Sequence, residues 1–290
     1  MKIGIIGLGN MGAPMANNLA KASYEVTGFD IILPCPEGIT SASSAVSIAK
    51  SCDVIITMLP NGEIVQSVSE EIIPEMLDGS ILLDCSTIDV ETAVKVANLA
   101  SKYGVLAGDA PVSGGVGGAV SGSLTFMVGG SEVTFNKVAP LLKIMGQKSV
   151  HCGPSGSGQA AKICNNMILG TTMIATCEAF ILADKLNLDR QKMFDVVSTS
   201  SGYSWSMNTY CPAPGVGPVS PADNNYKPGF SSDLMLKDLK LSQLAAKSVN
   251  ADTPMGKLAT ELFKTYVEDE DGSGKDFSSM IERFSKRDHP

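Results

Sequence analysis

The chain has 290 residues, 44% of them hydrophobic, which is enough for a large core and for more than one domain. Its formal net charge of -8 disfavours nucleic acids and anionic lipid surfaces as partners, because both are themselves negatively charged. The seven cysteines include no C-x-x-C pair, which indicates neither a disulfide framework nor a zinc site and fits reduced thiols.

The N-terminal residues lead directly into a predicted strand over 2–6, and from the sequence as given we expect no signal or transit segment. No apolar run approaches the roughly 18–20 residues that a membrane-spanning helix needs. We therefore expect no membrane partner. We expect a cytoplasmic location if the protein is bacterial, and the mitochondrial matrix if it is a processed eukaryotic protein.

The first half of the chain alternates short apolar segments with helical patterns. The predicted strands cover 2–6, 25–30, 54–59, 81–85, 105–110, 124–128 and 149–152. Several are continuously apolar, as at Val54-Ile55-Ile56, which is typical of parallel strands covered by helices on both faces. The alternation predicts a doubly wound α/β domain.

A glycine-rich pattern follows the first strand. It is G-x-G-x-x-G, formed by Gly7, Leu8, Gly9, Asn10, Met11 and Gly12. A helix over 11–22 and a second strand are predicted next, and this context is the fingerprint of a Rossmann-type dinucleotide-binding unit. Gly7 permits a tight turn, Gly9 lets the backbone approach a pyrophosphate, and Gly12 allows close helix–strand packing. The helix N-terminus favours the anion.

Asp30 ends the second predicted strand and distinguishes between the two nicotinamide cofactors. A carboxylate here accepts hydrogen bonds from the adenosine ribose 2′-OH and repels a 2′-phosphate. Ile31, Ile32 and Leu33 follow, with no arginine to bind such a phosphate. The sequence therefore predicts NAD rather than NADP as the cofactor.

The pattern changes after Gly158, where a long apolar helical stretch without proline runs to Leu188. Asp189 is the predicted N-cap of a helix over 190–197, and the remainder indicates further helices with a Pro- and Gly-rich excursion at 211–230. We predict a dinucleotide-binding Rossmann domain over 1–161 and an all-helical substrate and dimerisation domain over 162–290, joined by the long helix.

A dehydrogenase needs a group that takes the alcohol proton as hydride leaves. The two histidines are poorly placed for this, because His151 closes a strand and His289 is next to last. No tyrosine has a lysine four residues later, and the cysteines offer no zinc as a Lewis acid. Lys162, near the start of the long apolar helix, remains, with Asn166 one turn further on the same face. The alternative is a surface lysine with a partly buried stem.

These residues lie in motifs that resemble those of the β-hydroxyacid dehydrogenase family over essentially the whole chain. The matching motifs are the fingerprint with Pro14-Met15-Ala16-Asn17-Asn18-Leu19, the stretch Asp109-Ala110-Pro111-Val112-Ser113-Gly114-Gly115, residues 156–166 around Lys162, and Lys237-Asp238-Leu239 preceded by Phe230. Further segments, such as 124–130 and 276–279, resemble the branch that acts on 3-hydroxyisobutyrate. Asp30-Ile31-Ile32 does not resemble the NADP-preferring reductases of the family.

The resemblance implies roles for individual residues. Lys162 is implied as the catalytic acid/base, and Asn166 as a residue that helps to hold the substrate. Ser113, Gly114 and Gly115 are implied to bind the substrate carboxylate, which fits the anion-binding nest that successive backbone N–H groups form. Other residues are implied to line the cofactor or close the substrate pocket. They are Leu59, Pro60, Thr87 and Lys237 for the cofactor, and Trp205, Tyr210 and Asp238 for the substrate.

The implied activity is the NAD-dependent oxidation of 3-hydroxyisobutyrate to methylmalonate semialdehyde, as in valine breakdown, without a metal ion. L-serine or 3-hydroxypropionate is an alternative substrate, because one methyl group is worth only about 1–3 kcal/mol of discrimination. A non-enzymatic NAD-binding homologue is the alternative from another class. Apolar and small residues over 171–183 further predict a homodimer or homotetramer.

Overall fold

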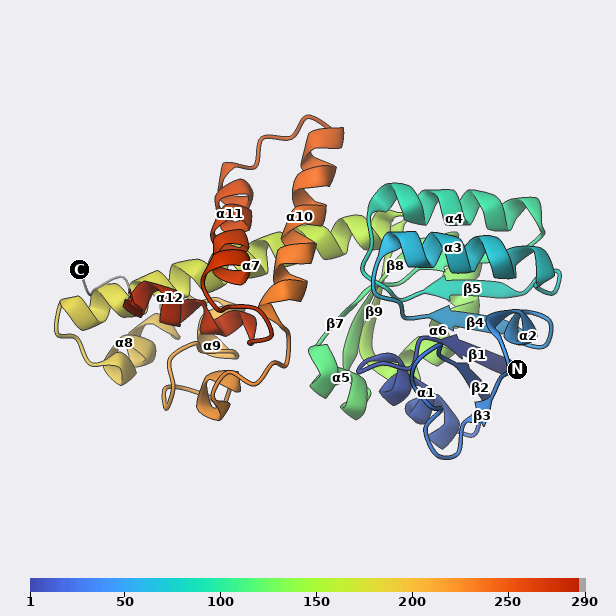
Figure 1. Cartoon of the computed structure of the whole chain (residues 1–290), viewed down its shortest axis with the longest axis horizontal. Coiled ribbons are helices and arrows are strands. Elements are labelled where there is room, and N and C mark those ends of the chain that lie inside the picture. The colour runs from blue at the N-terminus through green and yellow to red at the C-terminus, as the bar shows by residue number, and fades with distance from the viewer. Residues whose placement is uncertain (287–290) are drawn as a thin grey trace. The chain divides into compact units, whose positions relative to one another are not determined.

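The fold was analysed in a computed structural model, which describes residues 1–286 (Figure 1). The chain divides into two compact units, Met1–Lys162 and Ile163–Pro290.

The first unit, all of which is described, is built around a nine-stranded sheet of order β3-β2-β1-β4-β5-β6-β8-β7, in which β9 also pairs with β8. The parallel part consists of β1 (Lys2–Ile6), β2 (Glu25–Phe29), β3 (Thr40–Ser41), β4 (Val54–Thr57), β5 (Ile81–Asp84) and β6 (Leu106–Asp109). β8 (Leu124–Gly130) runs antiparallel to β6 and to β7 (Val112–Ser113), and parallel to β9 (Gly146–Gly153). The strand order reverses at β1, the position where such sheets bind dinucleotides.

Helices cover both faces of this sheet, as the continuous apolar strands predicted. Alternate residues of β4 face opposite cores, with Val54 and Ile56 in one and Ile55 in the other. The first core is completed by α1 (Gly12–Lys21), α5 (Gly115–Ser121) and α6 (Glu132–Met145). The second is completed by α2 (Ala45–Ala49), α3 (Gly62–Ile72), the 3-10 turn η1 (Ile73–Glu75) and α4 (Val90–Lys102). The predicted doubly wound α/β class is confirmed.

The regular elements in the described part of the second unit are helices, joined by loops. It contains most of α7 (Ser157–Lys185), then α8 (Arg190–Val197), α9 (Trp205–Asn208), η2 (Pro221–Asn224), α10 (Ser232–Ser248), α11 (Pro254–Asp269), η3 (Phe277–Ser279) and α12 (Met280–Lys286). Its core includes Phe180, Leu239 and Phe263. Asp189 caps α8 as predicted, because its Oδ1 accepts a hydrogen bond from Lys192 N at 3.0 Å.

α7 corrects one expectation from the sequence. By length and composition it could cross a membrane, with a mean hydropathy of 1.4 in its most apolar window. The search for a continuous apolar run missed α7 because polar residues interrupt that run, whereas the mean over its most apolar window remains high. The core helix of a soluble protein passes the same test, and 44% of that window is buried inside the protein.

Two short strands were not predicted. β3 and β7 have two residues each, too few to show any hydrophobic period. β9 begins at Gly146, earlier than the predicted residue 149, because the polar residues Gln147 and Lys148 hide its start. The other strand and helix ends differ from the predictions by only a few residues, as is usual at element boundaries.

Candidate active site

The predicted cofactor residues of the first unit all follow the carboxyl ends of parallel strands. Residues 7–12 follow β1, Asp30 follows β2, Leu59 and Pro60 follow β4, and Thr87 follows β5. Parallel strands present their carboxyl ends at one edge of a sheet, so these loops gather there. The fold therefore brings together segments that are far apart in the sequence.

The glycine loop has the backbone geometry that the fingerprint requires. Gly7 has a φ of +95°, and a Cβ at this position would collide with the carbonyl oxygen of Met58. A Cβ at Gly12 would collide with the carbonyl oxygen of Gly7. By contrast, a Cβ at Gly9 would meet no atom within 4 Å, which leaves open space beside the backbone. No side chain of the described residues caps the start of α1, so its first N–H groups suit an anion.

Asp30 has a structural role that sequence reasoning missed. Its Oδ2 accepts a hydrogen bond from Leu8 N at 2.7 Å, and its Oδ1 accepts from Ile32 N at 2.8 Å and Leu33 N at 2.9 Å. Partial burial raises the pKa of Asp30, but these backbone hydrogen bonds outweigh it and keep the pKa below its ordinary value. A charged Asp30 therefore ties the glycine loop to the end of β2.

Asp84 and Ser86 were also missed, although they hold the next two loops in place. Thr57 Oγ1 and Ser86 Oγ donate to Asp84 Oδ1 at 2.7 and 2.6 Å, and Leu59 N donates to Ser86 Oγ at 2.8 Å. Burial raises the pKa of Asp84 to about 6 despite these bonds. Its Oδ2 has no hydrogen-bond partner among the described residues. A polar residue at the end of the apolar run Ile81-Leu82-Leu83 was the available signal.

The predicted substrate loop lies between β7 and α5. Gly114 and Gly115 have φ values of +129° and +61°, in the region where side chains are strained. α5 begins at Gly115. Consecutive residues with positive φ can turn neighbouring N–H groups toward one point, the conformation that a carboxylate-binding nest needs.

Lys162 lies in the second turn of α7 and is only 7% exposed. This burial argues against the alternative of a surface lysine. The first turn of α7 is capped from β6 by Asp109, whose Oδ1 accepts from Gly156 N at 2.7 Å. The helix that carries Lys162 therefore starts at the same sheet edge as the cofactor loops.

Asn166 and Asp238 form a buried pair in the second unit. Asn166 Nδ2 donates to Asp238 Oδ2 at 2.5 Å, and Asn166 Oδ1 accepts from Asn165 Nδ2 at 2.9 Å. Lys237 Nζ lies 3.6 Å from Asp238 Oδ1. Asp238 therefore contacts both neighbours, which the sequence assigned to different roles, and it orients the Asn166 amide.

Trp205 and Tyr210 form a separate aromatic stack. Their ring centroids lie 4.8 Å apart, and Tyr210 also stacks on Phe277 at 5.3 Å. Tyr210 OH donates to Asp276 Oδ2 at 2.9 Å. Burial and the nearby Asp276 carboxylate raise the pKa of Tyr210. The only proton of the Tyr210 hydroxyl is therefore used within the protein, which sequence reasoning did not anticipate.

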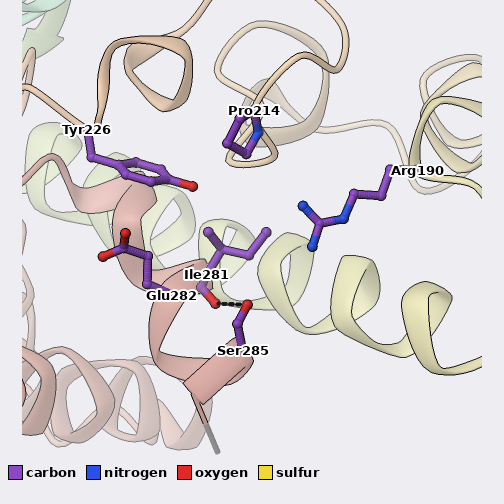
Figure 2. A pocket seen from close by; sticks show the side chains of 6 residues that line it. All are labelled: Arg190, Pro214, Tyr226, Ile281, Glu282 and Ser285. Atoms are coloured by element: carbon purple, nitrogen blue, oxygen red, sulfur yellow. Dashed lines mark hydrogen bonds between the residues drawn. The ribbon is translucent and has the colours of Figure 1, made fainter. Parts of the chain in front are cut away.

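The second unit contains a hollow of about 360 Å³ (Figure 2). It is lined by Arg190, Pro214, Tyr226, Ile281, Glu282 and Ser285. Arg190 is bound there to Asp184, with Nη2 and Oδ2 2.7 Å apart. The hollow contains no predicted site residue.

The two histidines and the possible metal ligands were considered in the sequence as catalytic groups. His151 Nε2 lies 2.8 Å from the carbonyl oxygen of Gly130, and its ring stacks on Phe135. These contacts give His151 a structural role at the edge between β8 and β9. His289 lies outside the described residues. Within residues 1–286, no group of three or more His, Cys, Asp or Glu side chains could hold a metal ion.

The chain matches two protein families, which together span most of its length. Residues 2–153 match the family described as the NAD-binding domain of 6-phosphogluconate dehydrogenase. Residues 156–284 match the family described as the NAD-binding domain of NADP-dependent 3-hydroxyisobutyrate dehydrogenase.

Individual relatives agree with these matches. The chain is 44% identical to 3-hydroxyisobutyrate dehydrogenase of Pseudomonas aeruginosa, over 99% of both chains. It is 44% identical to the human mitochondrial enzyme of that name, over 97% of this chain and 85% of the relative. Among solved structures, Mycobacterium tuberculosis 3-hydroxyisobutyrate dehydrogenase with L-serine has a TM-score of 0.93 and 43% identity, over 98% of each chain.

Proposed function

The chain belongs to the 3-hydroxyisobutyrate dehydrogenase family, and we propose that it oxidises 3-hydroxyisobutyrate to methylmalonate semialdehyde with NAD as acceptor. It is an oxidoreductase with an N-terminal NAD-binding domain. The observation that carries the proposed chemistry is the burial of Lys162 on a helix that begins at the sheet edge where the cofactor loops gather.

The residues of this edge fit a dinucleotide. The open space at Gly9 and the uncapped start of α1 suit a pyrophosphate, and Leu59, Pro60 and Thr87 would line the rest of the site. When bound, NAD supplies the hydride acceptor. Lys237 as a cofactor contact, and Trp205 and Tyr210 as pocket residues, stay predictions.

The chain's own residues bind the substrate and move the proton. Ser113, Gly114 and Gly115 bind the carboxylate through backbone N–H groups, which places the 3-hydroxyl toward Lys162. Lys162 Nζ removes the hydroxyl proton as hydride leaves C3, the carbon that bears this hydroxyl. In the reverse direction, protonated Lys162 donates that proton to the aldehyde oxygen. Asn166, one turn along α7, helps to hold the substrate.

We propose NAD rather than NADP because of the state of Asp30. Its hydrogen bonds keep the carboxylate charged, and that charge repels a 2′-phosphate. Ile31 and Ile32 follow Asp30 and are 86% and 82% exposed. Their side chains are uncharged and cannot bind a 2′-phosphate. One matched family is described as that of an NADP-dependent enzyme, and the ratio of kcat/KM with NAD to that with NADP tests the preference.

L-serine is the second candidate substrate, because the similar Mycobacterium tuberculosis structure is described with L-serine. Serine carries an amino group where 3-hydroxyisobutyrate carries its methyl group. A substrate panel separates the two: NADH formation is followed with 3-hydroxyisobutyrate, L-serine and 3-hydroxypropionate, each with NAD and with NADP. We expect the highest kcat/KM with 3-hydroxyisobutyrate and NAD. Activity confined to 2-hydroxy acids would overturn the proposal.

We further propose that the protein self-associates as a homodimer or homotetramer. α7 exposes the apolar side chains of Ile168 and Leu182, as a helix does when it pairs with another copy. Light scattering on the purified protein measures the mass directly. The compartment follows the source: several similar eukaryotic proteins, including those of Drosophila and mouse, are named mitochondrial.

A further inference from the structure

The first turn of α7 is attached to the sheet by the last residue of β6. Asp109 Oδ1 accepts from Gly156 N at 2.7 Å, and Asp109 Oδ2 accepts from Gln159 N at 2.9 Å. A carboxylate at a helix N-terminus satisfies free N–H groups and interacts favourably with the helix dipole. Burial raises the pKa of Asp109, and these hydrogen bonds oppose the rise. The contact is close enough that a Cβ at Gly158 would crowd Asp109 and the carbonyl oxygen of Met127.

The side chain of Gln159 makes a second attachment, to the loop after β5. Its Nε2 donates to the carbonyl oxygen of Ser86 at 2.8 Å, and its Oε1 accepts from Ile88 N at 3.1 Å. Both partners are backbone groups, so the orientation of the amide is fixed by chemistry. Gln159 is completely buried, at 0% exposure. We call this arrangement of Gln159, Ser86 and Ile88 the Gln159 clamp.

The clamp lies between two predicted functional residues. Thr87, predicted to line the cofactor, is the residue between Ser86 and Ile88. Lys162 is three residues after Gln159 on α7, so the two side chains lie near the same side of the helix. The clamp and the Asp109 cap together restrict both rotation and translation of the first turns of α7. These attachments therefore determine where the Lys162 side chain starts, relative to the loop that contains Thr87.

We propose that Gln159 is a positioning residue for the reaction, and that it acts by holding Lys162 in register with the cofactor loop at Thr87. This inference rests on the proposed function of Lys162. Proton and hydride transfer depend steeply on geometry, and a displacement of about 1 Å can lower the rate by about 100-fold. No sequence motif indicated this role, because the clamp joins residues that are 71 and 73 positions apart.

The first test removes the clamp without changing the volume of the side chain. Gln159→Met keeps an unbranched chain and loses both hydrogen bonds. We expect kcat to fall about 10- to 100-fold, with little change in the KM for NAD. The primary isotope effect with substrate deuterated at C3 should increase, because chemistry becomes more rate-limiting. Amide hydrogen exchange at Ile88 should accelerate, which reports the clamp independently of activity.

The control is Thr176→Val on the same helix. Thr176 is also buried, but its hydroxyl donates only to the carbonyl oxygen of Thr172 within α7. It should leave kcat, the isotope effect and Ile88 exchange unchanged. An increase in the isotope effect in Gln159→Met but not in Thr176→Val separates positioning from a general loss of stability.

Gln159→Glu provides a pH-dependent rescue, and it serves as the test if Gln159→Met does not fold. When protonated, the introduced carboxyl group has one O–H donor for Ser86 and one carbonyl acceptor for Ile88, as the glutamine amide has. When charged, it cannot donate. The charged groups near this position are Asp109 of β6 and Asp84 of β5, which favour protonation of the introduced carboxyl group, and Lys162, one turn along α7, which favours its charged form. We expect the kcat of this variant, relative to wild type, to rise about 10-fold as the pH falls, whereas the ratio for Gln159→Met stays flat.

The outcomes are distinct for the two proposals. A wild-type enzyme that oxidises 3-hydroxy acids, together with a Gln159→Met enzyme of unchanged kcat and isotope effect, would overturn the positioning role alone. Unchanged exchange at Ile88 would overturn the clamp itself. A wild-type enzyme inactive on every 3-hydroxy acid would overturn the proposed function, and the positioning role with it.

Discussion

The buried Asp238 carboxylate accepts a hydrogen bond from the Asn166 amide at 2.5 Å, although 72 residues separate them. The bond joins α7 to α10 inside the second unit. It also fixes the orientation of the Asn166 amide, since the nitrogen Nδ2 must face Asp238 to donate to it. Asn166 Oδ1 accepts from Asn165, and both ends of the amide keep further capacity, because Nδ2 has a second N–H and Oδ1 has a second lone pair.

The contributions of Asn166 and Asp238 to the free energy of unfolding should be strongly coupled. A double-mutant cycle with Asn166→Ala and Asp238→Ala should give a coupling of about 0.5–3 kcal/mol in the free energy of unfolding, measured by urea titration. Each single variant leaves a buried polar partner unsatisfied. The destabilisations of the two single variants should therefore sum to more than the destabilisation of the double variant. The exposed pair Lys240–Glu268 is the matched control and should couple by no more than about 1 kcal/mol. Equal coupling in both pairs would contradict the prediction.

Lys162→Met should lower kcat by about 10²–10⁴-fold, because it removes the group that takes the hydroxyl proton. The KM for NAD and the affinity measured by NADH fluorescence should stay near wild type, since Asp30, Asp84 and Ser86 make hydrogen bonds that hold the cofactor loops. Lys240→Met, on an exposed lysine, is the control and should keep full activity. Near-normal turnover of the Lys162→Met variant would remove the role assigned to this lysine.

The fold was largely predictable because its signals are local. The continuous apolar run Val54-Ile55-Ile56 indicated a strand buried on both faces, and the two cores on opposite sides of β4 confirm this. Gly7 and Gly12 were predicted from the fingerprint, and their crowded positions explain why only glycine fits. Two-residue strands such as β7 could not be found, because they carry no period.

The supporting residues of the site could not be predicted, because their roles exist only in three dimensions. Ser86 and Gln159 are ordinary polar residues in the sequence, and their shared contact spans 73 positions. Tyr210, by contrast, had a role implied from the sequence but has a contact that the sequence did not indicate. The resemblance implied a role in the substrate pocket, but the sequence could not show that Asp276, 66 residues away, accepts the proton of its hydroxyl.

The cofactor preference should depend on the charge of Asp30. Asp30→Asn keeps an acceptor for Ile32 N and Leu33 N and removes the repulsion of a 2′-phosphate. Its NH2 group faces Leu8 N, so this variant loses the bond to the glycine loop for both cofactors, and the ratio between them reports the charge. We expect the ratio of kcat/KM for NAD over NADP to fall about 10-fold or more, because a repulsion of about 1.4 kcal/mol is lost. Ile31→Arg, at a fully solvated position, should lower the ratio further by adding a cation. A wild-type enzyme that uses both cofactors equally would contradict the premise.

Asp84 should make stability depend on pH in a defined direction. Its pKa rises from an ordinary value of 3.8 to about 6, because burial disfavours the charged form. The folded protein therefore binds this proton more tightly than the unfolded chain. The resulting stabilisation is full below pH 3.8 and is lost as the pH rises through about 6. The corresponding free energy is of the order of 3 kcal/mol.

Asp84→Asn tests this because asparagine keeps an oxygen acceptor for Thr57 and Ser86 and cannot ionise. Relative to wild type, the variant should gain stability as the pH increases from about 4 to 7, by thermal unfolding at each pH. Its absolute stability includes a constant cost, because the new NH2 group replaces an oxygen that has no partner among the described residues. The exposed Asp53→Asn is the control and should show no such trend. A difference between Asp84→Asn and wild type that does not change with pH would mean that Asp84 stays charged in the folded protein.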